Sequence, residues 1–204
     1  MPAAIGVPLE SIEALGQEIA ARAGSRIVVV GAARNVGTTI TAITLARSLA
    51  RTRSVVLVDL ALAGPNLSVI AADPLAPGMA ELVAGAATYG DIITRDRHSR
   101  LHLVMAGRVA GDAQALIASA RLAVAVEALA RSYEHLVIDA GALPEMPAER
   151  CATLAQQAVL VASDVDGRAT LEARERLLRA GFTDVEILAS GGHKREAGRA
   201  PAAA

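Results

Sequence analysis

Short apolar runs alternate along the chain with segments whose apolar residues recur every three or four positions. The runs are expected to be strands, and they lie at 27–30, 55–58, 101–105, 136–138, 159–162 and 185–188. The periodic segments are expected to be helices, and they lie at 9–22, 39–50, 79–83, 112–131 and 168–180. Strands that alternate with helices favour a mostly parallel sheet with helices on both faces, which is a doubly wound α/β fold.

This pattern divides the chain into three parts. Residues 1–24 are an N-terminal helical segment, residues 25–190 are the α/β domain, and residues 191–204 are a tail. The tail consists largely of alanine, glycine and charged residues, so it has nothing to bury and we expect it to be disordered. A chain of 204 residues is long enough for one such domain with a full core.

A loop bounded by glycines follows the first expected strand. It reads Gly31-Ala32-Ala33-Arg34-Asn35-Val36-Gly37-Thr38-Thr39 and opens the helix at 39–50. Backbone N–H groups and the positive end of a helix meet there, which suits a phosphate group. The form resembles a P-loop, which ends in Gly-Lys-Ser/Thr, except that Thr38 stands at the lysine position. The candidate nucleotide-binding residues are Gly31, Arg34, Asn35, Val36, Gly37, Thr38 and Thr39.

Two aspartates follow other expected strands. Asp59 ends the second strand and Asp139 ends the fourth. Open α/β sheets bind ligands at the carboxyl ends of their strands, so both should lie beside the loop. In nucleotide hydrolases a loop hydroxyl and a carboxylate hold Mg²⁺, while a second acid orients water or substrate. Thr39, Asp59 and Asp139 are therefore the candidate Mg²⁺ ligands, although each aspartate alone is equally consistent with a turn or a helix cap.

Composition limits the cellular location and the binding partners that we expect for this protein. A net charge of −1 with 53% apolar residues gives no electrostatic reason to expect nucleic acid or an anionic membrane as partner. The N-terminus lacks a signal peptide, and no uncharged apolar run reaches the length of a membrane span. We therefore expect a cytoplasmic protein. Cys151 is the single cysteine and is expected to be a small buried hydrophobe, and the four histidines lack the spacing of a zinc site.

Five segments match, in order, motifs of one known family. They are 37–46 (Gly-Lys-Thr-Thr-x-Ala-x-Asn-Leu-Ala), 56–65 (Asp-Ala-Asp-Leu-Arg-x-Pro), 77–85 (Gly-Leu-x-x-x-Leu-x-Gly), 103–107 (Leu-x-Ala-Gly) and 135–139 (the Walker B strand). Together they resemble the cytoplasmic domains of bacterial tyrosine kinases, which accompany polysaccharide co-polymerases. These kinases belong to the wider group of ParA/MinD-like P-loop ATPases. The resemblance covers about residues 27–188 and implies a P-loop NTPase-like fold.

The chain departs from this family at the residues that carry charge. Besides Thr38 at the P-loop lysine, Ala33 stands at the additional lysine of the ParA/MinD type, and Ala61 replaces the second acid. The only lysine, Lys194, lies in the tail, and Arg34 is interpreted as a solvent-facing residue. Losing one charged donor to phosphate costs roughly 1.5–3 kcal/mol of binding. The cost to phosphoryl transfer is greater, so Mg²⁺ with ATP or ADP should bind weakly or not at all, and Asp59 and Asp139 would be vestigial catalytic acids.

The kinases of the family phosphorylate a cluster of tyrosines in their own C-terminal tails. Residues 191–204 contain no tyrosine, which excludes that reaction for this tail. Tyr89 and Tyr133 lie within the domain and are expected to pack. The family's ring-forming Glu-x-x-Arg-x-x-Arg helix also has no clean copy around Glu18 and Arg22.

The resemblance and the departures together predict a pseudokinase-like adaptor or regulator of surface polysaccharide, of the capsule, exopolysaccharide or holdfast kind. Its partner would be the cytoplasmic part of a membrane polysaccharide co-polymerase, which would recruit it to the inner face of the plasma membrane. No nucleic acid partner and no direct membrane span are expected, and a homodimer is left open.

Two alternatives remain. One is an active ParA/MinD-type ATPase, or a tyrosine autokinase, with a non-standard P-loop that uses Arg34. The other is a short-chain dehydrogenase, since 31–37 resembles Gly-x-x-x-Gly-x-Gly and Asp59 would bind a ribose. Against it, Asn35 replaces the middle glycine, and Asp59 lies 28 residues after Gly31 rather than roughly 20. Neither tyrosine has a lysine four residues later.

Two further groups of charged residues have simpler interpretations. The segment 95–100 is expected to be a solvated charged loop. Asp164 and Asp166 follow the strand at 159–162, where they either contact a nucleotide base or cap the next helix.

Overall fold

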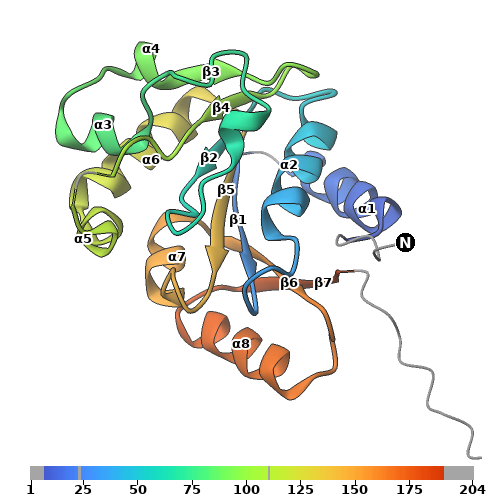
Figure 1. Cartoon of the computed structure of the whole chain (residues 1–204). Helices are drawn as coiled ribbons and strands as arrows, with labels where there is room; N and C mark the ends of the chain where they lie inside the picture. The colour runs from blue at the N-terminus through green and yellow to red at the C-terminus, as the bar shows by residue number, and fades with distance from the viewer. Residues whose placement is uncertain (1–6, 23, 110, 191–204) are drawn as a thin grey trace, which may run out of the picture.

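The computed structural model describes residues 7–22, 24–109 and 111–190 and contains one seven-stranded sheet. The strand order is β3-β4-β2-β5-β1-β6-β7, and all neighbours are parallel except β3 and β4. The strands are β1 (Ser25–Gly31), β2 (Val55–Asp59), β3 (Ile93–Arg95), β4 (His102–Val104), β5 (His135–Ala142), β6 (Gln157–Ala162) and β7 (Asp184–Ala189). The expected doubly wound α/β fold is confirmed (Figure 1).

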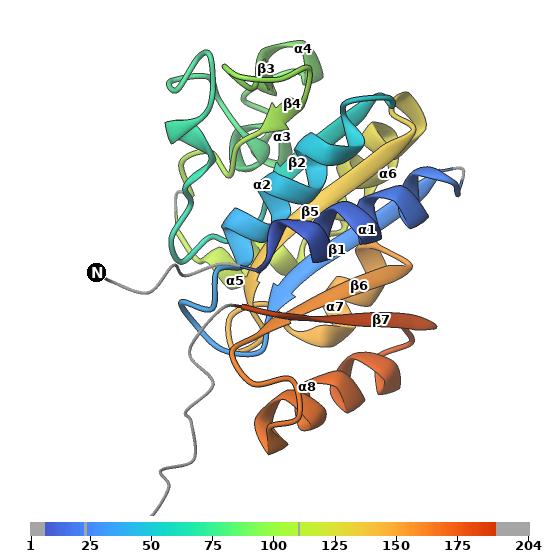
Figure 2. The same ribbon diagram turned by 90° about the vertical axis from the view of Figure 1, so that its right-hand side faces the viewer.

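Helices cover both faces of this sheet (Figures 1 and 2). One face carries α1 (Leu9–Ala20) and α2 (Thr38–Leu49). The helices of the other face are α3 (Met79–Ala84), α5 (Ala113–Ala118), α6 (Ala120–Ser132), α7 (Ala148–Leu154) and α8 (Arg168–Arg179). Two short elements, η1 (Leu67–Val69) and α4 (Tyr89–Ile92), lie in the connections.

The central strands contain continuous apolar runs because both of their faces are buried. In β1, Val28 and Val30 belong to the core on the α6–α8 side, whereas Ile27 and Val29 belong to the core on the α1–α2 side. All four side chains are at most 1% exposed. Parallel sheets with helices on both faces produce this continuous apolar run instead of an alternating one.

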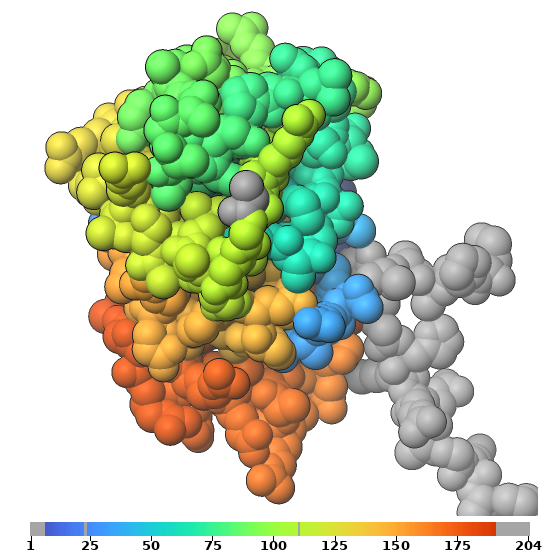
Figure 3. Space-filling view, turned by 60° about the vertical axis from the view of Figure 1, so that its left-hand side comes forward, coloured from blue at the N-terminus to red at the C-terminus, as the bar shows by residue number. Residues whose placement is uncertain are grey.

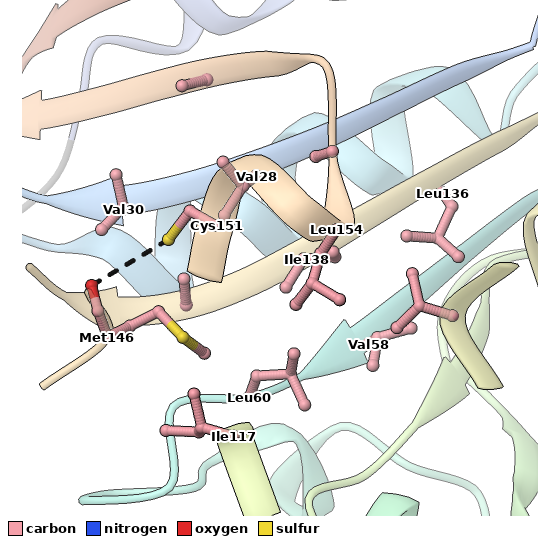
Figure 4. Packing of buried hydrophobic residues seen from close by; sticks show 14 of the residues in the cluster. Val28, Val30, Val58, Leu60, Ile117, Leu136, Ile138, Met146, Cys151 and Leu154 are labelled. Carbon is pink, nitrogen blue, oxygen red and sulfur yellow. Dashed lines mark hydrogen bonds between the residues drawn. The ribbon is translucent and has the colours of Figure 1, made fainter. Parts of the chain in front are cut away.

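The core on the α6–α8 side contains the single cysteine (Figure 4). Cys151 lies on α7 with no exposed surface, and its Sγ is 4.0 Å from the carbonyl oxygen of Met146. Burial raises the pKa of the Cys151 thiol to about 12. The expected role of this residue as a small buried hydrophobe is confirmed.

The helix expected at 112–131 is wrong in one respect, because the structure breaks it at Ser119. Ser119 has extended backbone angles and caps α6, which begins at Ala120, because its hydroxyl accepts a hydrogen bond from the amide of Arg121. A serine side chain that satisfies a free N–H favours a new helix start over a continuous helix. The helix α7 and the strand β3 were not expected, since seven and three residues are too few for a clear period.

The segment 95–100 is largely exposed, as expected, but it differs from a solvated loop at Arg95 and Asp96. Arg95 belongs to β3, and Asp96 is only 4% exposed. The Asp96 carboxylate accepts two hydrogen bonds from Arg47, at 2.8 and 2.7 Å, and one from the hydroxyl of Ser99. The cation that makes burial of this carboxylate possible comes from α2, 49 residues earlier in the sequence.

The tail expected to be disordered, 191–204, lies outside the described residues, and the division of the chain into three parts stays a prediction. Within 7–22, 24–109 and 111–190, no helix combines the length and the apolar character needed to cross a bilayer.

Candidate nucleotide site

The loop between β1 and α2 has the backbone of a phosphate cradle. A Cβ on Gly31 would lie 2.5 Å from Oγ1 of Thr38 and 2.7 Å from the carbonyl oxygen of Ala33, so only glycine fits there. Asn35 and Gly37 both have left-handed backbone conformations, with φ of 59° and 88°. Asparagine is among the few residues that adopt this conformation readily, so the turn is retained without the usual glycine.

The helix α2 starts at Thr38, and no side chain caps its first turn. The first N–H groups of a helix have no partner within the helix and are the groups that bind an anion. The backbone N–H groups that would hold a phosphate are therefore in place. At the lysine position, however, Thr38 is 8% exposed with its hydroxyl close to Gly31, and its neutral side chain contributes no positive charge.

A cleft of about 800 Å³ opens above this loop. Three segments line it: the loop itself, the segment after β2 and the segment after β5. In Figure 3 the blue surface of the loop borders the teal segment that follows β2 and the orange segment that follows β5. The predicted site residues that line the cleft are Arg34, Asn35, Gly37, Thr38 and Thr39. The other two support the loop from below, because Gly31 ends β1 and the Val36 side chain belongs to the core.

Arg34 is exposed, as expected, and forms an ion pair across the cleft. Its Nε lies 2.6 Å from Oε1 of Glu145, and the two side chains are 70% and 23% exposed. Among the described residues that line the cleft, Arg34 and Glu145 are the only charged ones. The cleft therefore has no net positive charge from its lining. Glu145 was not identified from the sequence, since it lies in a turn three residues before α7 and belongs to no motif.

The two aspartates lie on adjacent strands beside the cleft, although neither is among the described residues that line it. Asp59 ends β2, as the sequence predicted, whereas Asp139 lies within β5, three residues before that strand ends. They are register partners on adjacent strands and are 1% and 0% exposed. Oδ1 of Asp59 accepts a hydrogen bond from the amide of Ala61, and its Oδ2 accepts from the amides of Asn66 and Leu67. Oδ1 of Asp139 accepts from the amide of Gly141, whereas its Oδ2 has no hydrogen-bond partner.

Both carboxyl groups hold their protons more tightly than an exposed aspartate. Burial raises the pKa of Asp59 to about 6, and the neighbouring charge of Asp139 acts in the same direction against three amide hydrogen bonds. Burial also raises the pKa of Asp139, although the hydroxyl of Thr39 and the amide of Gly141 act in the opposite direction. Two adjacent carboxylates in a buried position repel each other unless a cation or a proton separates them.

The residues present fit a Mg²⁺ ion in part. Oδ2 of Asp139 is buried and unpartnered, and the Thr39 hydroxyl is close enough to influence the pKa of that carboxyl. A hydroxyl with a carboxylate oxygen is the ligand type that Mg²⁺ prefers. Asp59 is less available because both of its oxygens accept amide hydrogen bonds. Ala61, at the position of the family's second acid, presents only a methyl group to the cleft.

The remaining residues identified from the sequence lie elsewhere. Tyr133 packs against the core and forms a hydrogen bond of 2.7 Å with Nδ1 of His102. The expectation of packing is wrong for Tyr89, which is 39% exposed. Asp164 accepts a hydrogen bond from the amide of Asp166 in the turn after β6, but no side chain caps α8.

No family model matches this sequence, and no curated protein sequence matches it. Solved structures do. The kinase domain of the Escherichia coli tyrosine kinase ETK superposes with a TM-score of 0.80 at 20% identity, over 96% of this chain and 80% of that chain. The VpsO kinase domain gives 0.75 at 21% identity, over 88% and 91%. MinD from Pyrococcus horikoshii in complex with Mg-ADP gives 0.66 at 20% identity, over 80% and 68%. The chain therefore has the P-loop fold of bacterial tyrosine kinase domains and MinD-type ATPases.

Proposed function

We propose that this protein is a pseudokinase-like adaptor or regulator of surface-polysaccharide assembly and export, with a P-loop fold that no longer turns over nucleotide. It acts in the cytoplasm and docks on the cytoplasmic part of a membrane polysaccharide co-polymerase. The observation that carries the proposal is that the described residues lining the cleft, where the phosphates of a nucleotide would lie, supply no net positive charge.

The charge argument rests on three positions. Thr38 replaces the lysine and Arg34 is neutralised by Glu145, so neither supplies free positive charge, while Ala61 removes an acid that could help to hold Mg²⁺. Phosphoryl transfer depends almost entirely on positioning and on stabilising negative charge. Backbone amides alone, without a positively charged side chain, can still bind phosphate weakly, but they stabilise the transition state of phosphoryl transfer very little. Thr39 and Asp139 remain as Mg²⁺ ligands, so weak binding of Mg²⁺ with ATP or ADP is consistent with the proposal.

The polysaccharide assignment rests on the order of the five sequence motifs and on the structural neighbours. The neighbours named above include two bacterial kinase domains, ETK and VpsO. The superpositions include 96% of this chain for ETK and 88% for VpsO, so the structural similarity is not confined to the P-loop. We infer that the fold has been kept for binding to a partner rather than for its reaction.

Calorimetry with Mg·ATP and a phosphate-release assay test the loss of turnover, with the ETK kinase domain as a positive control. We expect weak or undetectable binding and no release above the rate of buffer. Clear turnover that Asp59→Ala abolishes would overturn the proposal.

Binding to the partner is tested separately. The cytoplasmic part of the co-polymerase from the same genome is immobilised, and capture of this protein is measured with and without Mg·ATP. We expect capture that does not depend on nucleotide. Capture that appears only with Mg·ATP would instead support a nucleotide-driven switch.

The first alternative is an active ATPase or autokinase that uses Arg34. It is disfavoured because the Arg34 guanidinium already binds Glu145. ATP-dependent dimerisation that Arg34→Ala removes would support it. The dehydrogenase alternative is disfavoured because the Asp59 carboxylate is buried and accepts three amide hydrogen bonds, which leaves it unavailable to a ribose. A fluorescence titration with NADH tests that alternative.

A further inference from the structure

A second cavity, of about 640 Å³, lies at the opposite end of the sheet from the nucleotide cleft. Its walls come from the residues just before β2, the turn between β3 and β4, and the residues just before β5. In Figure 1 the turn between β3 and β4 is at the top of the molecule, whereas the loop between β1 and α2 is at the bottom. The second cavity lies at the amino ends of the parallel strands and the nucleotide cleft at their carboxyl ends, and the two sites share no residue.

Arginine dominates the charge of this cavity. Arg53, Arg95 and Arg100 line it together with one carboxylate, Glu134. Arg53 pairs with Glu134 at 3.2 Å, and the same carboxylate accepts a hydrogen bond from the amide of Ser54. Arg95 and Arg100 are exposed and form no ion pair with any carboxylate in the described part of the chain. The cavity lining therefore has a net charge of about +2, in a protein whose overall net charge is −1.

The ion pair between Arg47 and the buried Asp96 keeps these charges from being neutralised. Asp96 lies between Arg95 and Arg97 in the sequence and is the nearest carboxylate along the chain. Its side chain has no exposed surface and points to Arg47, with which it forms two hydrogen bonds. The hairpin thus presents its arginines to solvent while its only carboxylate is turned inward.

Neutral hydrogen-bonding groups complete the cavity. His102 faces Arg95 as its register partner, and Nδ1 of His102 is 2.7 Å from the Tyr133 hydroxyl. The ring centroids are 5.5 Å apart in an edge-to-face arrangement, which fixes both rings. The Ser54 hydroxyl accepts a hydrogen bond from the amide of Glu134, so its own O–H remains available to donate to a ligand.

We propose that this cavity is a binding site for a phosphate group, held by Arg95 and Arg100 with Ser54, His102 and Tyr133 around it. Guanidinium groups present planar, paired N–H donors that match the oxygens of phosphate. The cavity is larger than one phosphate ion, so the ligand is a phosphorylated molecule whose remaining part also lies in the cavity or at its mouth. The site does not depend on the proposed function, because it lies away from the nucleotide cleft.

The source of the phosphate is either a free phosphorylated compound or a lipid headgroup, and two binding measurements distinguish them. Calorimetry with pyrophosphate tests the free ligand, and co-sedimentation with phosphatidylglycerol vesicles, against vesicles of phosphatidylcholine alone, tests the headgroup. We expect saturable binding in at least one measurement, weakened by salt. Amide NMR shifts must appear at Ser54, Ser99 and Arg100 rather than at the loop 31–39, which excludes binding in the nucleotide cleft.

The variant Arg95→Gln/Arg100→Gln should lower the affinity by about 100-fold or more, since each of the two lost charged hydrogen bonds contributes about tenfold or more. Both side chains are exposed and outside ion pairs, so the variant should unfold at the same denaturant concentration as the parent. The matched pair is the single variant Arg95→Gln and its control Arg97→Gln, each of which removes one charge from the same hairpin, the control from outside the cavity. An equal loss of affinity in the control would show a diffuse electrostatic effect, and no saturable binding by the parent protein in either measurement would overturn the site.

Discussion

Asp59 and Asp139 are register partners on the adjacent parallel strands β2 and β5, and both side chains are buried. The pairing extends to the backbone, because the amide of Leu60 donates a 2.8 Å hydrogen bond to the Asp139 carbonyl. Two carboxylates are thereby fixed side by side under a loop that lacks a lysine. Such an arrangement can bind a cation. Without a cation, the repulsion between the two buried carboxylates destabilises the folded protein.

This repulsion predicts a stabilising substitution. The pKa of Asp59 is about 6 in the folded protein, against an ordinary value of 3.8. A pKa that is raised on folding contributes stability that is complete below the unfolded value and is lost as the pH rises through about 6. The loss corresponds to on the order of 3 kcal/mol for a shift of about two units. Asp139→Asn removes the neighbouring charge and keeps the acceptor for Gly141, so it should stabilise the protein by about 1–3 kcal/mol at pH 7.5.

The measurement is urea unfolding with EDTA present, at pH 4.5 and pH 7.5. The gain from Asp139→Asn should be larger at the higher pH. Asp166→Asn, at an exposed carboxylate outside any ion pair, is the control and should change neither value. A gain of equal size at both pH values would contradict the electrostatic explanation.

The lost charge of the P-loop predicts the effect of restoring it. Thr38→Lys should raise the affinity for Mg·ATP by about 10- to 100-fold, because a charged donor to phosphate contributes about 1.5–3 kcal/mol. Calorimetry measures the change, and Thr38→Met separates the added charge from the added length. If the lysine and methionine variants bind ATP alike, the absence of lysine does not limit binding.

The ion pair between the partly exposed Arg47 and the buried Asp96 predicts a large loss of stability when the cation is removed. Burial acts to raise the pKa of Asp96, but Arg47 and Ser99 outweigh it and hold the pKa below its ordinary range. A lowered pKa contributes stability that is present at neutral pH and is lost as the pH falls. Arg47→Met leaves this carboxylate buried without a cation, so it should destabilise the protein by about 3 kcal/mol at pH 7 and by less near pH 3.

Denaturant unfolding at the two pH values checks this expectation. Arg51→Met is the control, since Arg51 is 73% exposed and its pair with Glu13 at 3.4 Å lies at the surface. That variant should change stability by about 0.5 kcal/mol or less. A loss of similar size in both variants would mean that the methionine, and not the buried carboxylate, is responsible.

Burial of Cys151 predicts an unreactive thiol. With a pKa of about 12 and no exposed surface, it is almost entirely in the thiol form at pH 8. Ellman's reagent should therefore give no rapid reaction with the folded protein and one thiol per chain in guanidinium chloride. Rapid reaction of the folded protein would show that α7 opens readily.

Most elements of the fold were predictable because they have strong local signals. The runs at 27–30 and 55–58 became β1 and β2, and the glycine loop lies between β1 and α2. The break at Ser119 and the three-residue strand β3 were missed, since a single hydrogen bond or a brief antiparallel pairing leaves no period to detect.

For the site, the sequence by itself determined which residues follow the strands, and hence that Asp59, Asp139 and the loop 31–39 lie at one end of the sheet. It also determined that the P-loop lysine is missing. Only the tertiary structure decided how charge is distributed, because ion pairs join residues far apart in sequence. It paired Arg34 with Glu145 and turned Asp96 inward to Arg47, so Arg95 and Arg100 have no carboxylate partner among the described residues. A charge has local effects only after folding has chosen its neighbours, and that choice depends on distance in space.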